Sequence, residues 1–117
     1  MLRKRVAVFT LTPFQKDGPM DVLDWLAHWY EAQCDGDWEH GFGLSIGTID
    51  NPGWSLKIDL AGTECDARTL ERTTHNYEHE TDWWVCWTED NVFRGACGPL
   101  HLRSLLEAFR HWATNLP

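Results

Sequence analysis

The chain has 117 residues, of which 43% are hydrophobic and 24% are charged. This length and composition predict one globular domain that can bury a core without disulfides or metals. The formal net charge of −8 argues against nucleic acid or anionic lipid as a partner, because an acidic surface repels both.

The first 19 residues are expected to form an arm outside the domain, which then covers residues 20–117. Residues 1–16 hold four basic side chains and no acidic one. The apolar run at 6–11 is too short and too interrupted for a signal peptide or a membrane span. A helix start follows Met20 directly, which makes Met20 a candidate initiator of the native chain. We therefore expect a cytoplasmic protein without a membrane partner.

The first predicted element of the domain is a helix over 21–34. Asp21 is a suitable N-cap, and Gly36 is expected to stop the helix. Apolar and aromatic side chains cover about 200° of the helical wheel, which is wider than one core-facing stripe. One of the pair Trp25 and Trp29 is therefore harder to bury.

Two strands, at 42–49 and 54–60, are predicted on either side of the turn DNPGW. Pro52 presets φ for the second position of a type II turn, and Gly53 is expected to supply the positive φ that follows. Residues 66–80 are ambiguous in pattern.

The later elements complete an α+β pattern. A strand at 81–87 alternates, with Trp84 and Cys86 on one face, and a strand at 92–98 returns beside it as a hairpin. A helix over about 99–114 carries a narrow apolar arc. This order predicts an antiparallel sheet of about four to five strands, with an N-terminal and a C-terminal helix packed on one face.

The segment QCDGDWEHGFG (33–43) lies at the centre of the acidic half of the chain. Between Asp17 and Leu56 there are eight acidic side chains and neither lysine nor arginine. Three tryptophans are harder to bury together, namely Trp38, Trp84 and one of the helix pair. Either they pack against each other or under a loop, or they face a partner, since exposed indoles beside charges are typical of protein-binding hot spots. We predict an acidic, tryptophan-rich surface for a basic partner. Its candidate contacts are Asp35, Asp37, Trp38, Glu39 and His40, joined by Asp24, Glu31 and Glu80 or Asp82 if the fold gathers them.

The same acidic segment also permits a purely structural interpretation. Gly36 can end the helix, and Asp35 or Asp37 can accept hydrogen bonds from the turn that follows. Acidity would then serve solubility.

An enzymatic alternative would use Glu39 with His40 as an acid–base pair, or His75 with His79 as metal ligands, in a small hydrolase. No nucleophile motif or phosphate loop accompanies the first pair, and the second presents both rings to one metal only on a helix. The cysteines show no CxxC spacing, so we expect neither a zinc ribbon nor a redox motif but reduced thiols at Cys34, Cys65, Cys86 and Cys97. We expect no cofactor, no metal and no catalytic residue.

Two long stretches carry a family resemblance. LDWLAHWYEAQCDGDWEHGFGLSIGTIDNPGWSLKIDLAGT (23–63) and DWWVCWTEDNVFRGACGPLHLRSLLEAFRHW (82–112) resemble the bacterial polymorphic-toxin immunity proteins of the family Immunity protein 53. The most specific parts are the run from Trp29 to His40 and the DNPGW turn. The resemblance covers most of the chain but leaves out the first 19 residues.

The resemblance implies a small cytoplasmic α+β protein that binds and neutralises a toxin encoded beside it. Many such toxins are nucleases, whose basic surfaces grip phosphate. The resemblance supplies no residue roles, so the candidate contacts rest on the residues alone. A module that binds a basic protein unrelated to toxins is a further alternative, and the surplus tryptophan is also compatible with a homodimer.

Overall fold

The computed structural model describes residues 20–115, so the predicted arm at 1–19 lies outside the described residues. Three helices and five strands follow one another along this part of the chain. They are α1 (Val22–Gln33), α2 (Trp38–Gly41), β1 (Leu44–Ile49), β2 (Gly53–Asp59), β3 (Thr73–His75), β4 (Trp84–Glu89), β5 (Val92–Cys97) and α3 (Leu102–Thr114).

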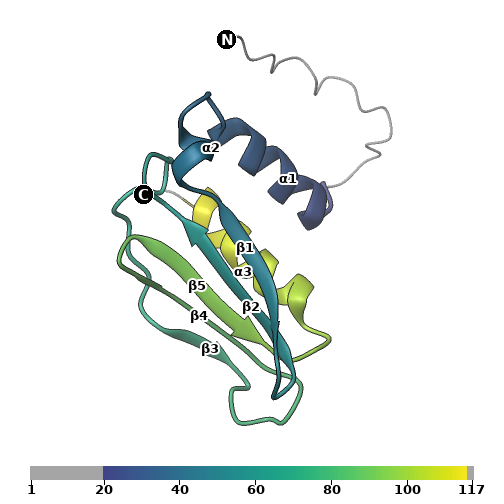
Figure 1. The fold of residues 1–117 in the computed structure, drawn as a ribbon. Coiled ribbons are helices and arrows are strands. Elements are labelled where there is room, and N and C mark those ends of the chain that lie inside the picture. The colour runs from purple at the N-terminus through teal and green to yellow at the C-terminus, as the bar shows by residue number, and fades with distance from the viewer. Residues whose placement is uncertain (1–19, 116–117) are drawn as a thin grey trace.

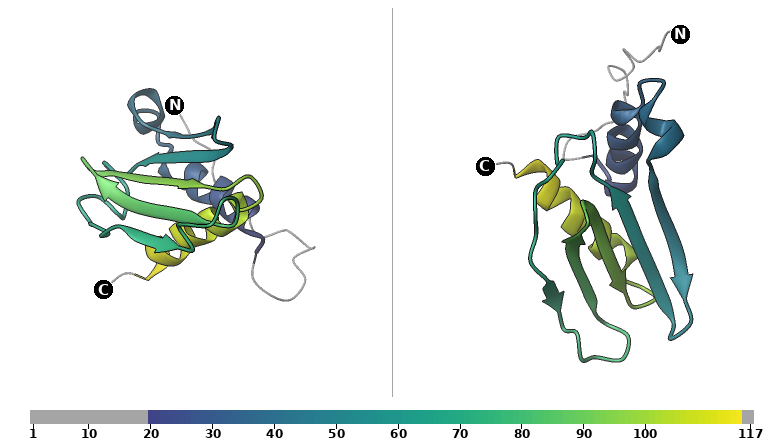
Figure 2. Two further views of the ribbon diagram at one scale, coloured as in Figure 1. Left: turned by 90° about the horizontal axis from the view of Figure 1, so that it is seen from below. Right: turned by 60° about the vertical axis from the view of Figure 1, so that its left-hand side comes forward.

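The strands form one antiparallel sheet in the order β1-β2-β5-β4-β3. The two long helices, α1 and α3, lie side by side against one face of this sheet (Figure 1, Figure 2). The predicted α+β architecture is confirmed, with its antiparallel sheet and its N-terminal and C-terminal helices.

The core lies between the sheet and the two long helices. Phe109 of α3 is fully buried at its centre, where its ring meets Trp29 of α1 at 5.2 Å and Phe93 of β5 at 4.9 Å between centroids. Gly95 of β5 leaves room for α3, because a Cβ at that position would lie 2.6 Å from Cδ1 of Leu105. Burial of such large side chains is the main source of stability for a domain of this size.

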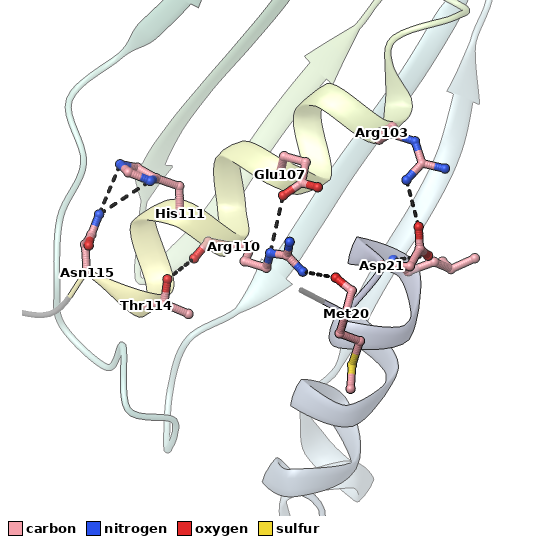
Figure 3. A network of polar contacts seen from close by, with 9 residues as sticks. Met20, Asp21, Arg103, Glu107, Arg110, His111, Thr114 and Asn115 are labelled. Carbon is pink, nitrogen blue, oxygen red and sulfur yellow. Dashed lines mark hydrogen bonds and ion pairs between the residues drawn. The ribbon is translucent and has the colours of Figure 1, made fainter. Parts of the chain in front are cut away.

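Polar contacts fasten the start of α1 to α3, as Figure 3 shows. Asp21 caps α1 by accepting the N–H of Leu23 at 3.0 Å, and its other oxygen accepts from Arg103 of α3 at 2.8 Å. Arg110 donates to the carbonyl oxygen of Met20 at 2.7 Å. The predicted N-cap is therefore confirmed, and it also ties the two helices together.

The turn between β1 and β2 differs from the prediction. The Asn51–Pro52 peptide is cis, and Gly53 does not have the positive φ of a type II turn, so that turn type is wrong. Glycine is required at 53 for a different reason. A Cβ there would overlap the carbonyl oxygen of Cys97 on the neighbouring strand β5.

The faces of the sheet also differ from the expectation for the tryptophans. Trp84 and Cys86 lie on the face covered by α3, in or against the core, which corrects the expectation that Trp84 is hard to bury. The short strand β3 falls in the region of ambiguous pattern and pairs with β4 at the sheet edge.

Three of the cysteines, Cys65, Cys86 and Cys97, are buried free thiols. Burial raises the pKa of both Cys86 and Cys97 to about 11. The thiol of Cys34 at the end of α1 donates instead to the carbonyl oxygen of Tyr30 at 3.4 Å. The three buried thiols belong to the core, and Cys34 is the C-cap of α1.

Candidate partner-binding surface

The acidic segment after α1 is an ordered turn that leads into the short helix α2, which the sequence pattern did not predict. Oδ1 of Asp35 accepts the backbone N–H groups of Asp37 at 2.9 Å and Trp38 at 3.0 Å. The Glu39 carboxylate reaches back to the N–H groups of Asp35 at 3.0 Å and Gly36 at 2.9 Å. This reciprocal arrangement resembles a capping box, so two of the acids are used to shape the loop.

Gly36 has the backbone conformation that this turn requires, with φ at +98°. Other residue types enter that region only with strain. The prediction that Asp35 hydrogen-bonds the turn is therefore confirmed. The prediction that Gly36 ends the helix is wrong, because α1 already ends at Gln33 with Cys34 in an extended conformation. Asp37 is exposed, and its side chain makes no capping hydrogen bond to α2.

Trp38 lies beneath this loop instead of on its surface. Its side chain is buried, and its indole N–H donates to the carbonyl oxygen of Ala61 at 2.7 Å. Its ring packs against Tyr30 of α1 at 6.1 Å and Phe42 at 6.2 Å between centroids. The expectation that Trp38 is an exposed anchor is therefore wrong. The exposed aromatic side chains near the acidic loop are Tyr30 and Phe42, both supported by Trp38.

None of the eight tryptophans, all of which lie within residues 20–115, is exposed. Both helix tryptophans face inward, because Phe109 of α3 gives Trp25 and Trp29 a common partner at 5.8 and 5.2 Å. The indole of Trp29 also donates to Glu64 at 2.6 Å, which satisfies its N–H. The predicted floor of exposed indoles is therefore wrong.

Two predicted acidic contacts form a stripe along the exposed side of α1. Asp24 and Glu31 are seven residues apart, which is about two helical turns, so they point in nearly the same direction. Both are exposed. The stripe leads toward the loop that holds Asp37.

Beside the acidic stripe, an apolar groove of about 430 Å³ separates α1 from the start of β1. Its lining residues are Leu23, Asp24, Leu26, Ala27, Tyr30, Gly43 and Leu44. Leu23 is 61% exposed and Tyr30 is 40% exposed, so large apolar side chains face solvent here. The groove could not be predicted from the sequence, because its two walls come from α1 and from the start of β1, and no sequence pattern links these two elements.

Glu80 and Asp82 do not join this surface. The register brings together the start of β1, the end of β2 and the start of β5, whereas β4 begins beside the far end of β5. The loop before β4, which carries Glu80 and Asp82, therefore lies at the opposite end of the sheet from α2 (Figure 1). Asp82 is paired there with His101 at 2.7 Å.

Other acidic side chains lie near α2 instead. Glu64 accepts from Trp29 at 2.6 Å, which places it beside the end of α1. Asp66 accepts the N–H of Gly62, and this bond, together with one from Asn91, holds its pKa below the ordinary value. Both belong to the segment after β2, so their distance along the chain hid them from the sequence analysis.

The residues of the enzymatic alternative are not arranged as catalytic pairs. Glu39 and His40 are adjacent on a helix, where neighbours point about 100° apart, and the Glu39 carboxylate is bound to backbone N–H groups. His75 ends β3 and its ring stacks on a tryptophan, whereas His79 accepts backbone N–H groups of its own loop. Within residues 20–115, no group of three or more His, Cys, Asp or Glu side chains is arranged to hold a metal ion.

Another set of side chains, formed by Asp82, His101 and Ser104, has the order of a catalytic triad. Nε2 of His101 is 2.7 Å from Asp82, and its Nδ1 is 3.3 Å from Oγ of Ser104. His101 is, however, the residue that precedes α3, and Ser104 lies three positions later. This is the spacing of an N-cap residue and the third residue of a helix, so the contact between His101 and Ser104 is local to the start of α3.

The family model described as Immunity protein 53 matches residues 23–114. No curated protein and no solved structure matches the chain. Among the described residues, no helix combines the length and the apolar character needed to cross a membrane.

Proposed function

The chain belongs to the Immunity protein 53 family, and on that premise we propose that it binds a cognate bacterial toxin and neutralises it. The inhibition is non-covalent and stoichiometric and needs no cofactor. It takes place in the cytoplasm of the cell that makes the toxin.

The proposed interface is the exposed side of α1 with the loop that follows. Asp24, Glu31 and Asp37 supply the negative charge, and all three are exposed. Tyr30 and Phe42 supply the apolar contact area, since both are exposed aromatic side chains held in place by the loop.

The other predicted contacts have different places in this proposal. Asp35, Trp38 and Glu39 shape and support the loop from within, and His40 belongs to the same segment. Glu80 and Asp82 are left out of the interface because they lie at the other end of the sheet.

The observation that carries this proposal is the one-sided charge of the segment next to exposed apolar side chains. Residues 17–56 hold no lysine or arginine, so no basic side chain of this segment neutralises the stripe. Such a field attracts a basic surface and accelerates encounter, whereas aromatic side chains at the centre of an interface supply most of the affinity. A nuclease toxin fits this description, because its substrate-binding surface must attract phosphate.

Co-expression with the toxin encoded beside this gene tests the proposal. Cells that express the toxin alone should die, and cells that also express this chain should survive and yield both proteins in one complex. Survival without a complex, or death despite ample folded protein, would contradict the proposal. A chain truncated before α3 serves as the negative control, because it lacks half of the helix layer and should give no protection.

A further inference from the structure

Strand β1 leaves one edge of the sheet open. It stands at the end of the strand order and pairs only with β2 among the described residues. Its sequence, LSIGTI, contains no charged residue and no proline. Exposed edge strands are normally protected from other chains by charges, prolines or bulges. An unprotected edge of six residues is therefore suited to pairing with another strand.

The register shows which backbone groups of β1 are available. The N–H of Asp59 donates to the carbonyl oxygen of Gly43, so Gly43 faces β2. Backbone groups alternate in direction along an antiparallel strand. The N–H and C=O groups of Leu44, Ile46 and Thr48 therefore point away from β2, toward the open edge.

The side chains of the same three residues point toward the helix layer. Leu44 packs against the core and lines the groove below α1, and Ile46 is exposed by 36%. A strand added to β1 would place every second side chain on this same face. Those side chains would enter the groove between β1 and the apolar flank of α1.

We propose, in an inference that rests on the proposed function, that the toxin contributes an extended segment. This segment pairs with β1 and extends the sheet. Its alternate apolar side chains fill the groove beside Leu23 and Tyr30. Basic side chains flank them and face Asp24 and Glu31 on α1. Main-chain hydrogen bonds then hold the segment, and charge complementarity selects it.

A second copy of this chain is a poorer occupant of the edge. Antiparallel pairing of two β1 strands about a two-fold axis puts both helix layers on the same side of the joint sheet. The α1 helices of both copies would then lie near each other. Both carry Asp24 and Glu31 and neither carries lysine or arginine, so their charges would repel.

The opposite edge of the sheet provides an internal comparison. Strand β3 has only three residues, and it follows Arg72, which stacks on Tyr77 at 4.8 Å. The groove of about 660 Å³ on that side is rimmed by charges of both signs, including Arg103 and Glu107. A short edge with mixed charge matches a basic strand less well than β1 does.

Amide hydrogen exchange followed by NMR, on the full chain alone and bound to inactivated toxin, tests this inference. In the complex, the amides of Leu44, Ile46 and Thr48 should exchange at least tenfold more slowly than in the free protein. The intervening amides, which bond to β2, should be protected in both states, and those of β3 should not change. A complex in which the first three amides still exchange at the free rate would overturn the strand addition while leaving toxin binding intact.

Two substitutions at one position distinguish main-chain hydrogen bonding to the toxin from contact with the side chains of β1 alone. Ile46→Ala shortens the side chain but keeps the N–H, whereas Ile46→Pro also removes an N–H that β2 does not use. The proline variant should bind toxin about tenfold more weakly than the alanine variant, which is the worth of one main-chain hydrogen bond. Equal affinities of the two folded variants would overturn the inference. So would protection of these amides in the free protein that rises with its concentration, because that would identify a second copy as the occupant.

Discussion

The indole N–H of Trp38 donates to the carbonyl oxygen of Ala61 at 2.7 Å and so joins the acidic loop to the segment after β2. Replacement by phenylalanine keeps most of the ring and removes this donor. We expect Trp38→Phe to lower the free energy of unfolding by about 1 kcal/mol, and Trp38→Ala by about 3–5 kcal/mol. Urea denaturation measures both. Trp87→Phe is the control, because its N–H meets only exposed Glu89 at 3.3 Å and its loss should cost little.

Two acidic residues of the loop are expected to have different roles, one in the stability of the fold and the other in toxin binding. Glu39 accepts backbone N–H groups of Asp35 and Gly36, so Glu39→Ala should cost about 1 kcal/mol of unfolding free energy. Asp37 has no such bond to α2, so Asp37→Ala should leave stability within about 0.5 kcal/mol but slow association with the toxin. Denaturation and stopped-flow binding of the same two proteins measure this contrast. Equal losses of stability would show that the loop does not depend on Glu39.

Gly47 of β1 and Gly53 of β2 differ in how much space the structure leaves for a Cβ atom at their position. A Cβ at 53 would overlap a backbone oxygen of Cys97, whereas a Cβ at 47 would meet only Oγ of Ser55 at 3.7 Å. We expect Gly53→Ala to destabilise the protein by roughly 3 kcal/mol or more, and Gly47→Ala to be nearly neutral. Thermal unfolding of the two variants tests this, and a stable Gly53→Ala protein would show that β2 and β5 are farther apart than described.

Asp21 should make stability depend on pH. Its hydrogen bonds with Arg103 and the N–H of Leu23 hold its pKa below the ordinary value of 3.8. A carboxylate with a lowered folded-state pKa stabilises the fold above its unfolded pKa, and this contribution disappears as pH falls through the folded value. Asp21→Asn should therefore be less stable than the wild type at pH 7 but should approach it as the pH falls through the lowered pKa of Asp21. A stability difference that stays constant from pH 7 to about pH 2 would contradict this role.

The sequence predicted the long elements well because their patterns are local. The apolar arc of α3 and the N-cap at Asp21 can be recognised within a few turns of chain, and both are confirmed. The helix α2 has only four residues, too few for a periodic signal, and it depends on side-chain contacts with the preceding turn. Its existence could not be predicted from the hydrophobic pattern.

Burial of the tryptophans was harder to predict because it depends on distant partners. The helical wheel of α1 is too wide for one core face, but Phe109 of α3 fills the space between Trp25 and Trp29. Trp38 finds its hydrogen-bond acceptor 23 residues away along the chain. The acidic residues can be located in the sequence, but the sheet register decides which of them lie together in the fold. The register of β4 and β5 places Asp82 away from the acidic loop.

The central claim is that the toxin binds on the α1 side of the molecule. Association kinetics with purified toxin test this claim most directly. The variant Asp24→Lys with Glu31→Lys reverses the acidic stripe, and Glu78→Lys with Glu80→Lys makes the same charge change at the opposite end of the sheet. The first should slow association at least tenfold at low salt and flatten its salt dependence, whereas the second should bind nearly as the wild type does. If both variants lose the same association rate, or if only the second does, the interface is not where we place it.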